Sequence, residues 1–267
     1  MDGAPRAAGR GRMMNQPATD PGGIMRLSTR TYGSGPRRIG LVHGLGADGA
    51  LWKGLTDRIV ALGDTTVVTV DLAGHGESPR SDSYTIDAFA DGVVDALPVS
   101  LEVVAGHSLG GAVLERAIAR LRPSRGVYLD PGLALALPTT GAKGRLFWAV
   151  APLALTLAAV AQQRKAKGRP PYSAEDAALR DAARDAFDKR MTVGVFRDIA
   201  FHPAPIAAPA VPSTLVLSDD SPAVVPDDVV AQLEELGWSV RQLSGIGHDF
   251  WLEDPDRTWT GIRDLFA

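Results

Sequence analysis

The chain has 267 residues, of which 45% are hydrophobic and 22% charged, values that are ordinary for a globular domain with its own core. The formal net charge of -3 gives no indication of a nucleic-acid or anionic-membrane partner. Because there is no cysteine, disulfides and cysteine-bound metals are excluded, and a reducing cytoplasm is the expected location.

The first 23 residues differ from the rest of the chain in composition. They are rich in Gly, Ala, Pro and Arg and lack the apolar stretch of a secretory signal. We therefore expect residues 1–23 to form a disordered tail.

From residue 25 onward, apolar runs alternate with helical patterns. This alternation indicates βαβ units and predicts an α/β fold with a doubly wound, mostly parallel sheet. The sequence predicts strands at residues 25–32, 38–43, 66–70, 101–105 and 126–129, and helices at 48–62, 85–97 and 112–120. The alternation resumes with strands at 213–217 and 240–243 and helices at 227–236 and 256–266.

Residues 132–210 contain no predicted strand. They hold the apolar stretch LFWAVAPLALTLAAVA, the basic turn QQRKAKGRPP and a polar helix with Ser173 as its N-cap. The apolar stretch is shorter than the ~20 residues that span a bilayer, so a buried or lid helix is expected and stable membrane insertion is not. We expect an α/β core of residues 24–131 and 211–267, with residues 132–210 forming an inserted helical cap and linker.

The segment VVAGHSLGG at residues 103–111 places Gly106-x-Ser108-x-Gly110 between a predicted strand and a predicted helix. This is the context of a nucleophile elbow, a strained turn that lifts a serine hydroxyl above the sheet edge. The glycines leave room for the turn, and the backbone N–H of Leu109 at the helix N-terminus can stabilise an oxyanion. Taken alone, the pattern is also compatible with a glycine-rich loop and a capping serine.

Two histidine-containing turns complete the candidate site. In His43-Gly44-Leu45-Gly46, which ends an earlier strand, the N–H of Leu45 would be a second oxyanion donor and His43 would orient the loop. His248 follows the last predicted strand and is the candidate general base for the serine. His75 and Asp71 are expected to be structural residues of a turn.

The motifs HGLG, DLAGHGES, GHSLGG and GHDFWLEDPDR, in this order and spacing, resemble the α/β-hydrolase superfamily. They are most similar to its capped small-molecule branch, which includes esterases, carbon–carbon bond hydrolases and cofactor-free haloperoxidases. The resemblance implies Ser108 as nucleophile, His248 as base, and oxyanion N–H groups on Leu45 and Leu109. No metal-ligand spacing or dinucleotide fingerprint is present, so neither a metal nor a cofactor is expected.

The acid of the site is where the sequence departs from the family pattern. Family members usually carry it in a Gly-x-x-Asp turn, but Ser218 and Ser221 occupy those two positions here, with Asp219 and Asp220 between them. Some members place the acid instead at the end of the strand before the cap, where this chain has Asp130. Asp130 is therefore the first candidate and Asp220 the second, while Asp219 or no functional acid stays open.

The aromatic residues of the cap and the core suggest a small-molecule substrate. An apolar pocket is expected to be lined by His43, Trp52, Phe147, Trp148 and Trp251, although the cap residues are also compatible with a core of the cap itself. We expect a serine hydrolase that cleaves an ester or related acyl bond, or a carbon–carbon bond, through an acyl-enzyme. A non-catalytic protein that binds small ligands on the same fold is the alternative, and the displaced acid supports it. The sequence does not indicate an oligomeric state.

Overall fold

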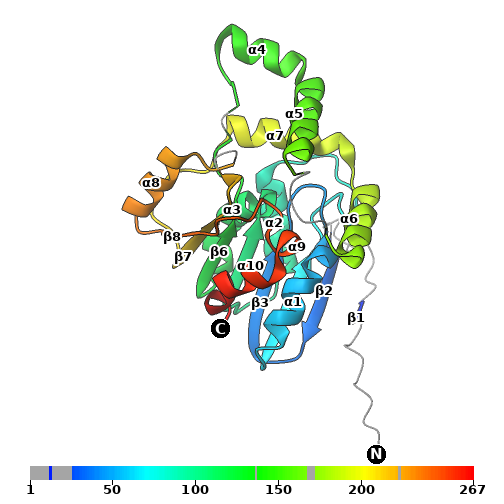
Figure 1. Ribbon diagram of the computed structural model, residues 1–267, viewed down its shortest axis with the longest axis vertical. Coiled ribbons are helices and arrows are strands. Elements are labelled where there is room, and N and C mark those ends of the chain that lie inside the picture. Colours follow the sequence, from blue (N-terminus) through cyan, green and yellow to red (C-terminus); the bar gives the residue numbers. More distant parts are fainter. Residues whose placement is uncertain (1–11, 14–25, 136, 167–171, 222–223) are drawn as a thin grey trace, which may run out of the picture.

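The computed structural model describes residues 12–13, 26–135, 137–166, 172–221 and 224–267, and one central sheet organises them (Figure 1). The strand order is β1-β2-β4-β3-β5-β6-β7-β8. The pairs β1·β2 and β2·β4 are antiparallel and all other pairs are parallel, which confirms the predicted sheet. The strands are β1 (Arg12–Met13), β2 (Thr29–Gly33), β3 (Arg37–Val42), β4 (Thr65–Val70), β5 (Val103–His107), β6 (Arg125–Leu129), β7 (Ser213–Leu217) and β8 (Ser239–Gln242).

Helices cover both faces of this sheet. One face packs against α2 (Ile86–Ala96), α3 (Leu109–Leu121) and α8 (Asp227–Glu235). The other face packs against α1 (Lys53–Val60), α9 (Phe250–Glu253) and α10 (Pro255–Ile262). The central strands are therefore buried on both sides, which is why they are continuous apolar runs in the sequence.

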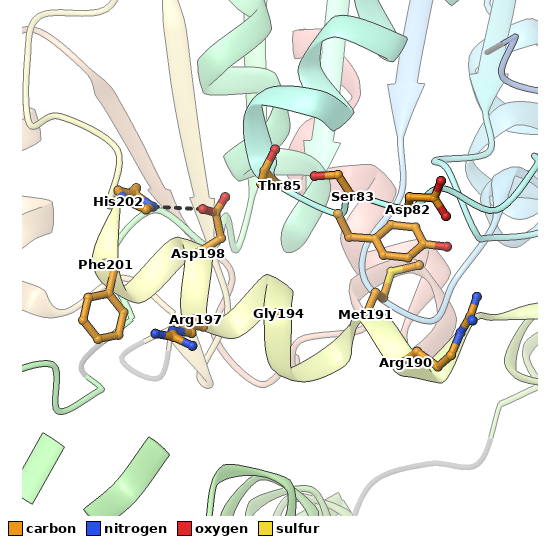
Figure 2. Close-up of a pocket in the computed structure, with 11 residues that line it drawn as sticks. Asp82, Ser83, Thr85, Arg190, Met191, Gly194, Arg197, Asp198, Phe201 and His202 are labelled. Carbon is orange, nitrogen blue, oxygen red and sulfur yellow. Dashed lines mark hydrogen bonds and ion pairs between the residues drawn. The ribbon is translucent and has the colours of Figure 1, made fainter. Parts of the chain in front are cut away.

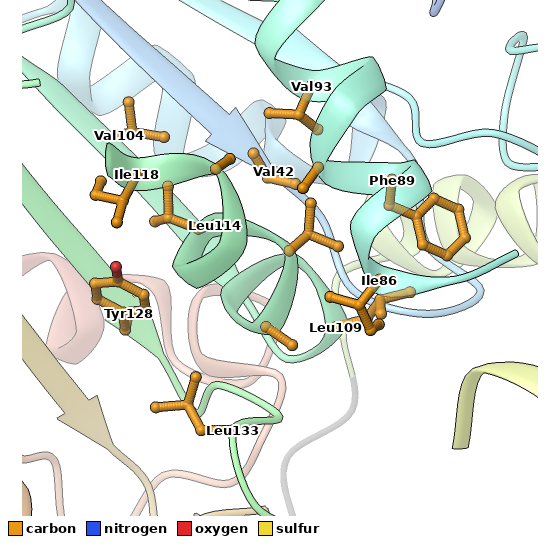
Figure 3. Close-up of a cluster of buried hydrophobic side chains, with 14 of the residues drawn as sticks. Val42, Ile86, Phe89, Val93, Val104, Leu109, Leu114, Ile118, Tyr128 and Leu133 are labelled. Atoms are coloured by element: carbon orange, nitrogen blue, oxygen red, sulfur yellow. The ribbon is translucent and has the colours of Figure 1, made fainter. Parts of the chain in front are cut away.

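Residues along a strand alternate between the two hydrophobic clusters that these helices form. In β3, Ile39 and Leu41 belong to the cluster under α1, whereas Val42 belongs to the cluster under α2 and α3. Figure 3 shows the second cluster, in which Phe89 of α2 and Leu114 of α3 lie near Val42. This packing fixes the strand ends, and so the edge from which the candidate site is built.

Three predicted helices differ by two residues or more from the observed ones at their ends, and the one expected at 112–120 already begins at Leu109. The helix expected at 48–62 starts as a 3₁₀ turn, Gly49–Trp52, because the Asp48 carboxylate accepts the backbone N–H of Ala50 at 2.9 Å. The helix expected at 256–266 ends at Ile262 and continues as a short 3₁₀ turn. Of the predicted N-terminal tail, only Arg12 and Met13 are among the described residues, and they form β1.

The connection between β6 and β7 carries the cap helices. They are α4 (Gly141–Ala149), α5 (Ala151–Ala166), α6 (Ala174–Ala186) and α7 (Thr192–Phe201). Ser173 caps α6 as predicted, since its hydroxyl accepts the N–H of Asp176 at 3.0 Å. The apolar stretch expected to form one helix is divided between α4 and α5 at Val150. None of the helices that the structure describes combines the length and the apolar character needed to cross a membrane.

Candidate active site

Ser108 occupies the turn between β5 and α3. Its backbone has φ 53° and ψ −115°, a conformation that side-chain-bearing residues rarely adopt, so the turn is strained. The glycines around it are required by space: a Cβ on Gly106 would overlap the carbonyl oxygen of Gly110, and a Cβ on Gly110 would overlap that of Val42. Packing therefore holds the serine, which stays half-buried, at the carboxyl edge of the sheet.

His248 and Asp130 lie side by side at the same edge. His248 stands in the loop after β8, and its Nδ1 is 3.1 Å from Oδ2 of Asp130, a fully buried residue directly after β6. Asp220, the second candidate acid, contacts the backbone of His248 instead, accepting its N–H at 3.3 Å. Asp219 accepts the N–H of Gly245 at 2.8 Å. Of the three carboxylates, Asp130 is thus the one for which a contact with the imidazole ring is observed.

Two serines complete the surroundings of the Asp130 carboxylate. The hydroxyls of Ser218 and Ser221 both donate to it, and the Ser218 N–H donates at 2.9 Å. Burial raises the pKa of Asp130, but the hydrogen bonds from His248 and the two serines outweigh this effect and hold the pKa below its ordinary value. Ser218 and Ser221 occupy the Gly and Asp positions of the Gly-x-x-Asp turn described above. The sequence shows this substitution, but it does not show that the two hydroxyls bind Asp130.

The surroundings of His248 affect both the pKa of its imidazole and which ring nitrogen carries the proton. Burial lowers the pKa of its imidazole, but the hydrogen bond and the charge of Asp130 outweigh burial, so that the pKa is raised. A carboxylate on Nδ1 fixes the tautomer in which Nε2 is free to accept a proton. This arrangement is the one that a general base requires.

His107, inside the elbow, supports the His248 loop. Its Nε2–H donates to the backbone carbonyl of His248 at 2.8 Å, and the two rings are 4.6 Å apart. Burial and the neighbouring His248 lower the pKa of His107 to about 4, so it is neutral at pH 7. The sequence did not predict this contact, because the two residues are 141 positions apart in the chain.

His43 orders the loop that carries Leu45. Its Nδ1–H donates to the carbonyl of Gly44 at 2.8 Å, and its Nε2 accepts the N–H of Leu72 at 2.9 Å. Gly44 is directly beside the elbow, since a Cβ there would lie 3.1 Å from Cβ of Ser108. Leu109 is the first residue of α3, where backbone N–H groups lack partners within the helix. The two expected oxyanion donors therefore belong to segments that flank the serine.

His75 and Asp71 are structural residues, as predicted. The Asp71 carboxylate accepts N–H groups of Gly49 at 2.7 Å and Glu77 at 2.9 Å, and it pairs with Arg30 at 2.7 Å. His75 is fully buried and donates from Nδ1 to the carbonyl of Ala73 at 3.0 Å. This turn thereby connects the start of β2 and the end of β4 to the 3₁₀ turn Gly49–Trp52, which precedes α1.

The expected pocket residues of the core are buried among other side chains. Trp52 is fully buried and stacks on Trp251, with ring centroids 4.0 Å apart and an angle of 15° between the rings. The Trp251 indole N–H donates to the carbonyl of Leu51 at 2.8 Å. Both tryptophans belong to the hydrophobic cluster under α1 and α9. His43 is 2% exposed and lies against His75, with ring centroids 4.9 Å apart.

The apolar residues of α4 and α5 differ from expectation in another way. Trp148 donates from its indole to the carbonyl of Pro138 at 2.9 Å and packs against Phe147 and Phe201, within the cap. Leu146, Leu153 and Leu157, however, are 60–68% exposed. They form neither a pocket wall nor a core of the cap.

The helix that lies over the elbow is α7. Its apolar residues Val195 and Ile199 are buried, as is Met191 of the 3₁₀ turn Lys189–Met191 that precedes it. Gly132 lies between this helix and the elbow, since a Cβ there would be 3.5 Å from the Ser108 carbonyl oxygen and 3.8 Å from Cδ1 of Ile199. Ile199 of α7 therefore lies close to the backbone of the elbow.

A cavity of about 620 Å³ lies between α7 and the loop before α2 (Figure 2). The residues around it come from these two segments, and Ser108 and His248 are not among the described residues that line it. They are Asp82, Ser83, Tyr84, Thr85, Arg190, Met191, Gly194, Arg197, Asp198, Phe201 and His202. The cavity is therefore separate from the candidate catalytic residues.

The cap is joined to the His248 loop by a polar cluster around Asp249. The hydroxyl of Tyr172 donates to this carboxylate at 2.6 Å, and Arg180 of α6 pairs with it at 2.9 Å. Burial raises the pKa of Asp249, but the charge of Arg180, together with His107, His248 and the hydrogen bond from Tyr172, holds the pKa below its ordinary value. The residue directly after His248 thus anchors a cap helix, which the sequence interpretation missed.

The arrangement is compatible with chemistry by side chains alone. Among the residues that the structure describes, no group of three His, Asp or Glu is arranged to hold a metal ion. A hydroxyl on a strained turn, an imidazole with a buried carboxylate on Nδ1 and two flanking backbone segments are the parts that nucleophilic acyl transfer uses.

Comparison with known proteins agrees with this fold. A family model described as "Alpha/beta hydrolase family" matches residues 41–259. Lipase LipV of Mycobacterium tuberculosis is 38% identical over 123 residues, which are 42% of this chain and 44% of the lipase. A pimeloyl-[acyl-carrier protein] methyl ester esterase of Methylococcus capsulatus is 38% identical over 103 residues, 37% of this chain and 37% of that esterase. Both matches cover less than half the length of these relatives.

Solved structures are similar over most of the chain. A putative aryl esterase from Burkholderia cenocepacia has a TM-score of 0.69 and 21% identity, covering 96% of this chain and 97% of that chain. An enol-lactonase from Burkholderia xenovorans LB400 has a TM-score of 0.67 and 20% identity, covering 90% of this chain and 96% of that chain. At these identities the likeness concerns the fold alone.

Proposed function

Because the chain belongs to the alpha/beta hydrolase family, we propose that it is a serine hydrolase with Ser108, His248 and Asp130 as its catalytic triad. The reaction is cleavage of an ester or related acyl bond of a small, mostly apolar substrate through an acyl-enzyme. The contact between the buried Asp130 carboxylate and Nδ1 of His248 carries this proposal. The names of the two curated relatives support an ester, with a carbon–carbon bond as the second candidate.

The proposed mechanism assigns one task to each residue. Asp130 accepts the Nδ1–H of His248, so that Nε2 takes the hydroxyl proton of Ser108. The serine oxygen attacks the substrate carbonyl, and the N–H groups of Leu45 and Leu109 stabilise the oxyanion. His248 gives the proton to the leaving group and then activates the water that hydrolyses the acyl-enzyme.

The surroundings of the serine support an apolar acyl group. The apolar face near the elbow consists of Val195 and Ile199 of α7 and Met191 of the turn before it, which offer only apolar atoms from their side chains. A substrate that reaches Ser108 would contact this face and displace part of its packing. A short or medium acyl chain is therefore favoured over a charged acid.

The proposal is tested with a fluorophosphonate probe and a series of nitrophenyl esters of increasing chain length. Wild type should be labelled and should turn over the esters, whereas Ser108→Ala should do neither, because labelling needs an activated serine. A wild type that is neither labelled nor active on any ester would favour the non-catalytic binding protein. The preferred chain length measures the space under α7.

A further inference from the structure

Apolar side chains gather on the outer surface of α4 and α5. Among the described residues eight large hydrophobic side chains are exposed, and four of them lie within twelve consecutive positions. These four, Leu146, Val150, Leu153 and Leu157, are 68%, 45%, 61% and 60% exposed, and we call them the apolar ridge. Leu146 lies on α4, Val150 is the residue between the two helices, and Leu153 and Leu157 lie four residues apart on one face of α5. The ridge therefore concentrates exposed apolar side chains in one short segment, unlike the scattered apolar residues of an ordinary surface.

The ridge stands apart from the rest of the molecule. In Figure 1, α4 and the first part of α5 project beyond the sheet and the helices that pack on it. Substitutions on the ridge are therefore separable from the fold and from the candidate catalytic residues.

The sequence around the ridge has a charge unlike that of the rest of the chain. Between Asp130 and Glu175 there is no Asp or Glu, but there are six Lys or Arg residues. The remainder of the chain has 22 Lys and Arg against all 31 Asp and Glu. Lys143 and Arg145 are exposed on α4, and the other four cations belong to the sequence QQRKAKGR at residues 162–169, whose side chains are outside the described ones. The net charge of the whole chain conceals this asymmetry.

We propose that the apolar ridge and the neighbouring exposed cations Lys143 and Arg145 dock the protein on the surface of a bilayer that contains anionic phospholipids. Leucine side chains gain by entering the boundary between headgroups and acyl chains, and cations beside them gain from the negative surface potential. The α5 helix has 16 residues, fewer than the ~20 that span a bilayer, so the binding is peripheral. This inference goes beyond the proposed function and does not depend on it.

Two other occupants fit the ridge less well. A second copy of the chain would bring two sets of flanking cations together, which a symmetric interface disfavours. An acidic protein would satisfy the cations, but it would give the leucines no apolar environment unless it had a matching groove. A bilayer of anionic lipids satisfies both features at once.

The test is co-sedimentation of the full chain with vesicles of phosphatidylcholine, alone or mixed with phosphatidylglycerol. We expect wild type to bind the mixed vesicles about tenfold or more tightly than the neutral ones, and less tightly as salt rises. The variant Leu146→Ser/Leu153→Ser/Leu157→Ser should lose about tenfold or more of this binding. A matched control, Val99→Ser/Leu236→Ser, removes apolar side chains of 78% and 40% exposure elsewhere and should bind as wild type does.

Circular dichroism melts of each variant verify folding, which exposed positions should leave intact. Wild type that binds neither kind of vesicle, or a triple variant that binds as well as wild type, would overturn the proposal. A wild-type dimer in analytical ultracentrifugation that the triple variant loses would identify a second copy as the occupant and would also overturn it. So would binding to an acidic protein, such as an acyl carrier protein, without binding to vesicles. Ester hydrolysis by the triple variant, measured on a soluble nitrophenyl ester, should equal that of wild type, so this test is independent of the proposed triad.

Discussion

Moving the carboxylate of the proposed triad from residue 130 to residue 221 should abolish and then restore activity. Asp130→Gly removes the acid without backbone strain, because residue 130 has φ 39°, which glycine adopts readily. The Ser221 hydroxyl contacts the Asp130 carboxylate, so Ser221→Asp directs a new carboxylate into the space that Asp130 leaves. From there it can accept the Nδ1–H of His248.

The expected magnitudes follow from the hydrogen bonds. Loss of the triad acid costs roughly 10⁴-fold in kcat, because the imidazole is no longer held in its productive tautomer. The double variant regains tautomer control but lacks one of the two serine hydroxyls that now donate to the carboxylate. A hydrogen bond to a charged group is worth about 1.5–3 kcal/mol, so activity should settle about ten- to a hundredfold below wild type.

The assay is kcat and KM on a nitrophenyl ester for wild type, both single variants and the double variant. Asp220→Asn is the matched control, since the hydrogen bond observed between Asp220 and His248 joins the carboxylate to the backbone N–H and not to the ring. It should lose little activity. The reasoning is refuted if Asp130→Gly keeps wild-type activity, if Asp220→Asn is the more damaged variant, or if the double variant is no better than Asp130→Gly.

Three further predictions concern pH and packing. The kcat/KM of wild type should rise with pH through an apparent pKa above 6.5, because only the neutral imidazole of His248 accepts a proton. Burial lowers the pKa of His248, but Asp130 raises it by more. Asp130→Asn should therefore shift the rise of kcat/KM to lower pH, and an unshifted pH profile would exclude the pairing of Asp130 with His248. Burial, and secondarily the charge of His43, lower the pKa of His75 in the folded protein to about 3, below the ordinary 6.5. The unfolded chain therefore binds a proton at His75 at a higher pH than the folded protein does, and stability is lost as pH falls below 6.5. Urea unfolding at pH 7 and pH 5 should show that His75→Phe loses about 2 kcal/mol less than wild type over this interval, and equal losses would contradict the assignment. Gly110→Ala should destabilise the protein by about 2 kcal/mol or more, because the new Cβ would overlap a backbone carbonyl. Gly54→Ala should stabilise it by about 0.5–1 kcal/mol, because this Cβ would lie in a helix with no neighbour within 4 Å. Equal shifts of the melting temperature in the two variants would rule out the steric reason for Gly110.

The local parts of the fold could be predicted because their signals are local. The alternation of apolar runs and helical patterns predicted the parallel sheet, and β7 has the residues expected for it. The strained turn at Ser108 was predicted from the glycines beside it, since a missing Cβ is a property of the sequence. The cap of α6 at Ser173 followed from the capping rule for the same reason.

The sequence did not decide which carboxylate faces His248. Asp130 and Asp220 both follow strands that end at one edge, because β6 and β7 are parallel neighbours. Which of them reaches the imidazole depends on the course of two loops and on hydroxyls from Ser218 and Ser221. These contacts join residues about 90 to 120 positions apart, and no periodicity or short motif reports such distances.

The burial of the apolar residues separates what the sequence determined about this protein from what only the tertiary structure decided. Composition and pattern established that Trp52, Trp251 and the leucines of the cap are apolar, and hence that each would gain from leaving water. Whether a partner exists to cover each one is a property of the assembled chain. Trp52 and Trp251, which are 199 positions apart, stack on each other and are part of the core, whereas Leu153 on the projecting α5 is 61% exposed. The sequence by itself thus determined the elements and the strained turn at Ser108, and the tertiary structure decided which carboxylate contacts His248 and which apolar side chains stay exposed, because both depend on which distant segments the packing brings together.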